Sequence, residues 1–460
     1  MLNRRQLLAA AAAGALARPL AAAPREVLVL GAGLAGLAAA SLLAAQGHRV
    51  TVLEGRRRVG GRVLTLDAVP GHPEAGANVI GPNYGRVLDA ATRLRVPLRV
   101  PPANLDSGYA IDGHKIPADA WADSPFNPLA GRLRAVPPAR LLGPVLRDNP
   151  VAAGPDWCSG AHDALEVAAT DYLGQRGYDA AALALVDANN SYGNRLADTS
   201  MLSLLRVGAN FGRAVAMGQP VREVAAGNMR LPEALAASLP VPPVLGARAV
   251  AVRGRRDGVE VTLADGRHFS AEALVCTLPV PALRGLRFEP ALPAAQREAL
   301  VAIAYHKVVQ GHFLVREPYW ADSGEPAGWW TNGPLGRLFV RPLPGGERYN
   351  LTVWVNGDSC DRYRGPEAAE LLADDFFRFN PAARGRAELR QVVRWAEEPL
   401  TGGSWALWGP GQVGRYFEAL QLPGDRLFFA GEHTARANPG MEGAMESGER
   451  AALEVMRRLA

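Results

Sequence analysis

"REVLVLGAGLAGLAAASLLAAQGHRVTVLEG", residues 25–55, contains the most informative pattern of secondary structure in the chain. Its short apolar run at 26–30 is rich in branched residues and predicts a buried parallel strand. The alanines and leucines of 34–46 predict a helix, and 48–53 predicts a second strand. A strand, a helix and a second strand in this order predict a parallel α/β unit.

Three glycines between the first strand and the helix predict that this unit binds a dinucleotide. They form the spacing G-x-G-x-x-G, which lets the backbone approach a pyrophosphate at the start of a helix. Glu54 ends the second strand, where its carboxylate would accept hydrogen bonds from a ribose and disfavour a 2'-phosphate. This pattern alone leaves FAD and NAD open. The residues predicted to bind the nucleotide here are Gly31, Gly33, Leu34, Ala35, Gly36, Glu54 and Gly55.

Two further segments resemble the flavin amine oxidase family, and this resemblance favours FAD. "LEGRRRVGGRVLT", residues 53–65, resembles the E-x-R-x-R-x-G-G-R signature of that family. "RLFFAGEHTARANPGMEGAMESGERAA", residues 426–452, resembles its closing flavin motif. A helix that begins near residue 440 would stabilise negative charge on a reduced flavin through its free N–H groups. The resemblance adds the following predicted FAD-binding residues: Arg56, Gly61, Arg62, Val250, Gly431, Glu432, Gly440, Met441 and Ala444.

The resemblance implies an α/β fold of amine oxidase architecture. A FAD-binding Rossmann-type domain of the glutathione-reductase kind would be combined with a discontinuous α+β substrate domain. The likeness is specific in three blocks, at about 26–85, 224–310 and 395–455. We expect the FAD-binding domain at 24–105, 224–303 and 396–460, and the substrate-binding domain at 106–223 and 304–395.

"AYHKVV", residues 304–309, contains Lys307, one of only two lysines beside 48 arginines. In the flavin amine oxidase family, a lysine at the end of a strand in this region holds a water against flavin N5. A compact ammonium can reach N5 through a water and can lose its proton when buried, whereas a guanidinium does neither well. The resemblance therefore implies a catalytic role for Lys307. The alternative is a lysine that extends from a strand towards solvent.

"PLTGGSWALWGPGQ", residues 399–412, is predicted to lie on the substrate side of the flavin. In the monoamine oxidase branch of the family, this loop carries a cysteine bonded to the flavin and then an aromatic wall. Here Ser404 and Trp405 hold these places, so we expect noncovalent FAD and an indole wall, with packing as the alternative for Trp405. That branch has a second aromatic residue where this chain has Gly440, so the cage is expected to be open on one side. Lys307, Trp405 and Gly440 are the predicted catalytic residues.

The predicted reaction is oxidation of a small-molecule amine. Hydride transfer from the carbon next to the nitrogen to flavin N5 would give an imine that hydrolyses. The expected electron acceptor is O2 or a periplasmic cytochrome c. A carbon–carbon desaturase and a non-catalytic flavin protein on the same fold are alternatives.

An L-amino acid oxidase is a further alternative. Such enzymes bind the substrate carboxylate with an arginine, which in bacterial members follows a segment like "EAGANVIGP", residues 74–82. This chain has Asn78, Val79 and Ile80 there instead, so the usual arginine is missing. Arg206 or Arg213 could replace it.

The first residues, "MLNRRQLLAAAAAGALARPLAAAP", resemble a twin-arginine export signal. The apolar stretch at 7–17 is too short to span a bilayer, which needs about 20 residues. We therefore expect a signal at 1–23, export in the folded state by the twin-arginine translocase, and a periplasmic location. The signal and the loop at 405–412 also resemble those of bacterial exported nicotine oxidoreductases.

Composition limits the remaining functions. The chain has 460 residues with 48% hydrophobic and 21% charged residues, which is typical of a soluble protein of about two domains. Its arginines are scattered, so nucleic-acid binding is not expected. The three cysteines form no CxxC pair and the eight histidines show no metal-ligand spacing, so neither a disulfide framework nor a metal site is predicted.

Overall fold

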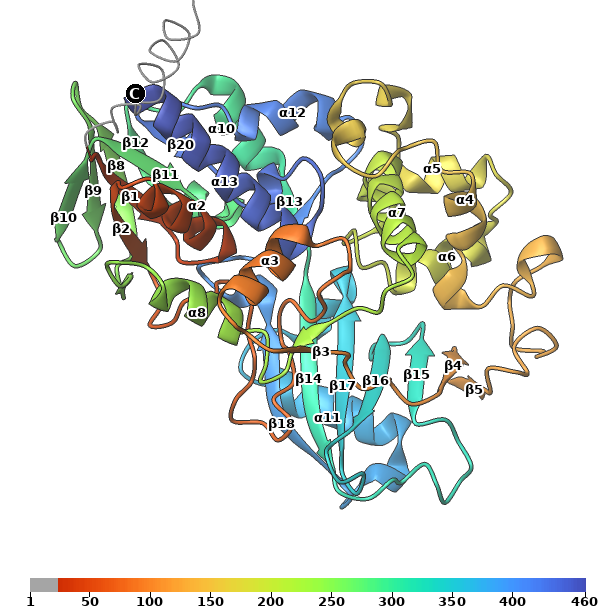
Figure 1. Ribbon diagram of the computed structural model, residues 1–460. Coiled ribbons are helices and arrows are strands. Elements are labelled where there is room, and N and C mark those ends of the chain that lie inside the picture. The colour runs from red at the N-terminus through yellow and green to blue at the C-terminus, as the bar shows by residue number, and fades with distance from the viewer. Residues whose placement is uncertain (1–23) are drawn as a thin grey trace, which may run out of the picture.

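The computed structural model describes residues 24–460, so the predicted export signal lies outside the described residues. The described chain is built of a parallel sheet with its helices, a second and larger sheet, and a group of helices on one side (Figure 1). No helix within 24–460 is both long enough and apolar enough to cross a membrane.

A five-stranded parallel sheet contains the unit predicted from residues 25–55. Its order is β20-β11-β1-β2-β7, and every neighbouring pair is parallel. The sheet joins segments that are far apart in the sequence, as its strands show: β1 (Glu26–Leu30), β2 (Arg49–Glu54), β7 (Val244–Leu245), β11 (Ala273–Cys276) and β20 (Leu427–Phe429).

Two helices pack against each other beside this sheet. They are α2 (Leu34–Ala45), which follows β1, and the last helix, α13 (Gly440–Leu459). A Cβ at Gly448 would lie 2.1 Å from the carbonyl oxygen of Ala35, so only a glycine lets α13 come this close to the start of α2. The shorter helices of this region are α3 (Gly85–Arg93), α8 (Arg230–Ala237), α9 (Val280–Arg284), α10 (Ala294–Ala302) and α12 (Gln412–Leu420).

A four-stranded sheet borders the parallel sheet. Its first three strands in the sequence, β8 to β10, form an antiparallel meander, and a fourth strand pairs with β8 in parallel. The bounds are β8 (Ala249–Gly254), β9 (Val259–Leu263), β10 (His268–Ala271) and β12 (Arg287–Glu289).

A seven-stranded sheet forms the second large layer, in the order β18-β14-β17-β16-β15-β4-β5. The strands are β4 (Ser107–Ile111), β5 (His114–Ile116), β14 (Val308–Val315), β15 (Gly328–Thr331), β16 (Arg337–Pro342), β17 (Tyr349–Asn356) and β18 (Ala387–Arg394). Helix α11 (Ala368–Phe379) covers one face, where the rings of Phe313 and Phe376 lie 4.2 Å apart. The opposite face is therefore available to line a site.

A group of helices lies beside the end of this sheet (Figure 1). Its longest member, α7, is amphipathic and buries Leu202 and Leu205 in the core. The helices are α4 (Gly143–Arg147), α5 (Ala169–Gly174), α6 (Ala180–Ala188) and α7 (Met201–Ala216). The domain boundaries given above stay predictions.

Candidate functional site

A cavity of about 610 Å³ lies between the carboxyl ends of the parallel strands, the start of α13 and one face of the seven-stranded sheet. Ligands of open parallel sheets bind at this edge. Every residue predicted to bind the nucleotide or the flavin lines the cavity except Gly36. A Cβ at Gly36 would lie 1.9 Å from the carbonyl oxygen of Gly31, so this glycine serves the packing of α2 on the turn. The predicted contact of Gly36 with the cofactor stays a prediction.

The first turn of α2 faces the cavity with free N–H groups. Gly33 precedes the helix without a side-chain cap, and a Cβ built on it would meet no protein atom within 4 Å. The nearby Glu54 is 4% exposed, and its carboxylate accepts hydrogen bonds from the backbone N–H groups of Ala32 at 2.9 Å and Arg56 at 2.8 Å. The buried Nε of Arg56 has no hydrogen-bond partner among the described residues.

An ion pair joins the two predicted flavin segments to the loop before Trp405. Arg62 Nη1 lies 3.1 Å from Glu432 Oε2 and donates a hydrogen bond to the carbonyl oxygen of Ser404 at 2.8 Å. The Glu432 carboxylate also accepts from the N–H of Ala406 at 3.3 Å. Both carboxylates that line the cavity, those of Glu54 and Glu432, are therefore engaged with protein groups.

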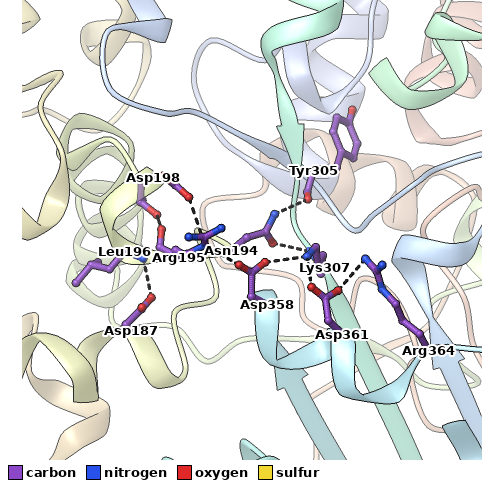
Figure 2. A network of polar contacts seen from close by, with 11 residues as sticks. Asp187, Asn194, Arg195, Leu196, Asp198, Tyr305, Lys307, Asp358, Asp361 and Arg364 are labelled. Carbon is purple, nitrogen blue, oxygen red and sulfur yellow. Dashed lines mark hydrogen bonds and ion pairs between the residues drawn. The ribbon is translucent and has the colours of Figure 1, made fainter.

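Lys307 does not line the cavity, which differs from the position that its predicted catalytic role requires. Its ammonium lies 2.8 Å from a carboxylate oxygen of Asp358 and 2.8 Å from one of Asp361 (Figure 2). Partial burial alone would lower the pKa of Lys307, but these carboxylates hold it above its ordinary value. The lysine is therefore a cation held by two acids, which is the opposite of a buried amine that loses its proton.

The backbone explains why Lys307 points away from the cavity. Strand β13 (Ala304–Tyr305) ends before His306, and β14 begins only at Val308. Between them, Asn194 fixes the chain: its Oδ1 accepts from the N–H of Lys307 at 2.9 Å, and its Nδ2 donates to the carbonyl of Tyr305 at 3.0 Å (Figure 2).

Gln310 is the polar side chain that β14 turns towards the cavity. Side chains alternate along a strand, so Val308 and Gln310 line the cavity while Val309 joins the core under α11. Gln310 is 1% exposed, and its Oε1 lies 3.3 Å from His312 Nε2. An uncharged amide thus occupies the strand on which an ammonium was expected.

Trp405 lines the cavity and is held by backbone pairing with the segment at 304–306. β13 pairs with β19 (Ala406–Leu407), the N–H of His306 donates to the carbonyl of Trp405 at 2.9 Å, and the rings of these two residues stack 4.7 Å apart. Burial lowers the pKa of His306 to about 3, so the imidazole behind the indole is neutral. One face of the Trp405 indole is therefore covered by the His306 ring, which holds the indole in place as a wall of the cavity.

Two tyrosines line the cavity near Trp405 and Gly440. The ring of Tyr192 lies 6.0 Å from that of Trp405, tilted by 36°. Gly440 has a φ of +70°, and a Cβ there would lie 3.6 Å from the hydroxyl of Tyr84. Burial raises the pKa of Tyr84 to about 12, so its phenol stays protonated. The side that lacks an aromatic residue at Gly440 is thus bordered by Tyr84.

The family is shown by comparison of the whole chain with known sequences. The profile described as flavin containing amine oxidoreductase matches residues 34–456. The chain belongs to this family. Its cofactor is FAD.

Relatives of this oxidoreductase include longer proteins. The lysine-specific histone demethylase 1 homolog 2 of Arabidopsis thaliana is 29% identical over 477 residues, covering 94% of this chain and 58% of the relative. An L-amino-acid oxidase of Mus musculus is 27% identical over 473 residues, covering 94% of this chain and 71% of the relative. The chain thus spans little more than half the length of the plant demethylase.

Solved structures confirm the predicted fold class. Cyclohexylamine oxidase from Brevibacterium oxydans IH-35A superposes with a TM-score of 0.77 at 21% identity, covering 95% of this chain and 99% of that one. Putrescine oxidase bound to putrescine gives a TM-score of 0.77 at 20% identity, covering 94% and 99%.

The residues of this oxidoreductase fit FAD. The uncapped start of α2, the open space beside Gly33 and the unpartnered Nε of Arg56 offer donors to a phosphate-bearing ligand. At the other end, α13 begins at Gly440, where its free N–H groups favour negative charge. These residues would hold the cofactor at its two ends.

The FAD of this oxidoreductase is noncovalent. Ser404, at the place predicted for a linking thiol, lines the cavity, and its Oγ lies 3.1 Å from His306 Nδ1. None of Cys158, Cys276 and Cys360 is among the residues that line the cavity. Within 24–460, no group of His, Cys, Asp and Glu side chains could hold a metal ion.

Among the cavity residues that the sequence did not predict, five polar or aromatic ones bear on the substrate compartment. Three come from neighbouring strands of the seven-stranded sheet, of which strand alternation would have found only the one on β14, once the break at 306–307 was known. Two come from loops that carry no motif. The five are Tyr84, Tyr192, Gln310, Arg337 and Trp354.

Proposed function

We propose that this flavin containing amine oxidoreductase oxidises an amine to an imine, which then hydrolyses. The chemistry that FAD supplies when bound is acceptance of a hydride from the carbon next to the amine nitrogen. The observation that carries the proposal is one continuous cavity, in which the FAD cradle opens onto a compartment bordered by Trp405 and Tyr192. Flat aromatic faces bind an amine substrate by packing and π interactions.

The cavity offers little acid–base machinery, which supports hydride transfer from a free amine. Glu432 is paired with Arg62, and the His306 imidazole is neutral behind Trp405. No carboxylate is left to bind a protonated amine among the described lining residues. The substrate therefore reacts as the uncharged amine, and the rate of flavin reduction rises with pH as the amine loses its proton.

The names of the similar proteins support the same class of substrate. They include oxidases of cyclohexylamine, putrescine and L-amino acids, and demethylases of histone lysine. An amine is the group that these substrates share.

We also propose a periplasmic location, with export of the FAD-loaded protein by the twin-arginine route and reoxidation by O2 or a cytochrome c. The support is the arginine pair and short apolar stretch at the start of the sequence. A fusion of residues 1–23 to a reporter that folds in the cytoplasm tests this proposal. We expect export that requires Arg4 and Arg5, and export that persists after both are changed to lysine would contradict it.

Anaerobic reduction of the bound flavin tests the proposed oxidation. The purified protein is mixed with primary, secondary, cyclic and amino-acid amines, and the absorbance of oxidised flavin is followed. We expect at least one class to bleach the flavin and to release an aldehyde or ketone with ammonia or an amine. A flavin that stays oxidised with every class would contradict the proposal and favour a desaturase or a binding protein.

A further inference from the structure

Arg337 is a cation that the seven-stranded sheet presents to the cavity. Trp354 on β17 pairs with Gln310 on β14 and with Arg337 on β16, so the three side chains form one row across adjacent strands. All three line the cavity. At about 4.8 Å per strand, Gln310 and Arg337 are roughly 10 Å apart along this row.

The positive charge of the Arg337 guanidinium has no carboxylate partner among the described residues. Its Nη2 donates to the carbonyl oxygen of Asn189 at 3.2 Å, and its buried Nε has no hydrogen-bond partner among the described residues. Burial lowers the pKa of Arg337, and the one titratable neighbour that opposes this shift is the phenol of Tyr192. A partly buried cation without a carboxylate is unfavourable, and an anionic ligand would relieve that cost.

The other arginines that line the cavity have partners or lie at the nucleotide end. Arg56 and Arg62 are paired with glutamates, and Arg248 is exposed beside the nucleotide half. Arg206 also lacks a carboxylate partner among the described residues and has an unpartnered buried Nε, but its guanidinium stacks 3.8 Å over the ring of Trp157 and donates to the carbonyl oxygen of Ala435 at 2.7 Å. Arg337 differs from Arg206 in that it lies in the strand row with Gln310 and Trp354, with no aromatic ring of the described chain stacked on its guanidinium.

Tyr192 lies near both the Arg337 guanidinium and the Trp405 indole. Burial raises the pKa of Tyr192, and the Arg337 guanidinium is close enough to oppose that rise. The ring of the same tyrosine lies 6.0 Å from that of Trp405. A ligand whose amine carbon packs on Trp405 can therefore extend past Tyr192 to the guanidinium.

We propose that Arg337 binds a carboxylate of the substrate, which makes the substrate class an amine that carries a carboxylate group. The inference rests on the proposed amine oxidation for the reaction, but the anion site itself does not. Of the two arginines that the sequence offered as substitutes for the missing clamp, Arg206 lines the cavity, whereas Arg213 is exposed on α7 and does not. Arg337 lies in a segment that carries no family motif.

Matched substrate pairs test the proposal. Phenylalanine is compared with phenethylamine, and 4-aminobutyrate with butylamine, by anaerobic flavin reduction in the wild type, Arg337→Gln, Arg337→Lys and Arg213→Gln. We expect the wild type to prefer the carboxylate member of at least one pair. Arg337→Gln should lose that preference by about 100-fold in kcat/KM, Arg337→Lys should keep part of it, and Arg213→Gln should equal the wild type. An equal loss for both members of a pair, or a wild type without preference, would overturn the proposal.

Binding of an unreactive carboxylate separates this proposal from the proposed reaction. Phenylacetate is titrated into the FAD-loaded proteins, and its Kd is read from the change in flavin absorbance, with FAD content and melting temperature as checks on folding. We expect the Kd to rise about 100-fold in Arg337→Gln. If Arg337→Gln binds phenylacetate more weakly than the wild type but no amine reduces the flavin, the anion site is supported and amine oxidation is rejected. The same Kd in both proteins would reject the anion site.

Discussion

The ammonium of Lys307 is 2.8 Å from each of two carboxylates, and its side chain is 22% exposed. Lys307→Met should therefore reduce stability and leave the chemical step intact. Because exposed ion pairs are weak, we expect a loss of about 1 kcal/mol in the free energy of unfolding. Denaturant unfolding and the anaerobic rate of flavin reduction are the two measurements. If Lys307→Met slows flavin reduction greatly and leaves the stability unchanged, Lys307 has a catalytic role.

Glu74 gives the stability a dependence on pH. Burial raises the pKa of its carboxyl to about 8 from 4.5, although Thr65 and Asn228 donate hydrogen bonds to it. Between these values the folded chain keeps a proton that the unfolded chain releases, so the free energy of unfolding falls as pH rises through this window. Glu74→Gln should flatten that fall, measured as melting temperature against pH. The exposed Glu347→Gln is the control, and an equal slope in both variants would contradict the assignment.

Residue chemistry alone placed the nucleotide end of the site and the indole of Trp405 at the cavity, but not the strand residues of its substrate end. Glycine spacing and Glu54 depend on backbone geometry that recurs locally, so they can be read from the sequence. Lys307 does not face the cavity because the break between β13 and β14 sets which side chains do, and Asn194, more than 100 residues away, fixes that break. Long-range contacts of this kind leave no local pattern.

The contact of α2 with α13 depends on Gly448. A Cβ at this position would lie 2.1 Å from a backbone oxygen of Ala35, so Gly448→Ala must shift one helix. We expect a loss of about 2 kcal/mol in the free energy of unfolding and weaker retention of FAD. Gly212→Ala on α7, where a Cβ meets nothing within 4 Å, is the matched control and should be neutral or stabilising. Equal stability of the two variants would contradict the role of this contact.

Elements with a strong local signal agree closely with the sequence predictions. The first strand is β1 (Glu26–Leu30) as predicted, the helix expected at 34–46 is α2 (Leu34–Ala45), and the last helix begins at Gly440. The seven-stranded sheet could not be ordered from the sequence. Its neighbours β4 and β15 are joined by a segment of more than 200 residues, so their pairing depends on packing of the whole domain.

At the scale of the whole molecule, the cavity that fits FAD is lined by residues from both ends of the described chain. The cavity takes its lining from positions as distant as Gly31 and Ala444, so a bound cofactor ties these segments together. Removal of FAD should lower the melting temperature, and added FAD should restore it. Free FAD at 100 times its Kd contributes about 2.7 kcal/mol. A melting temperature that does not change with FAD concentration would show that the cofactor does not bind this cavity.

Because Ser404 stands where a linking cysteine would form a thioether, the flavin can be removed from the protein without breaking a covalent bond. The bound FAD can therefore be exchanged for ring-substituted analogues of different reduction potential. The driving force of the reaction can then be varied while the walls of the pocket stay the same.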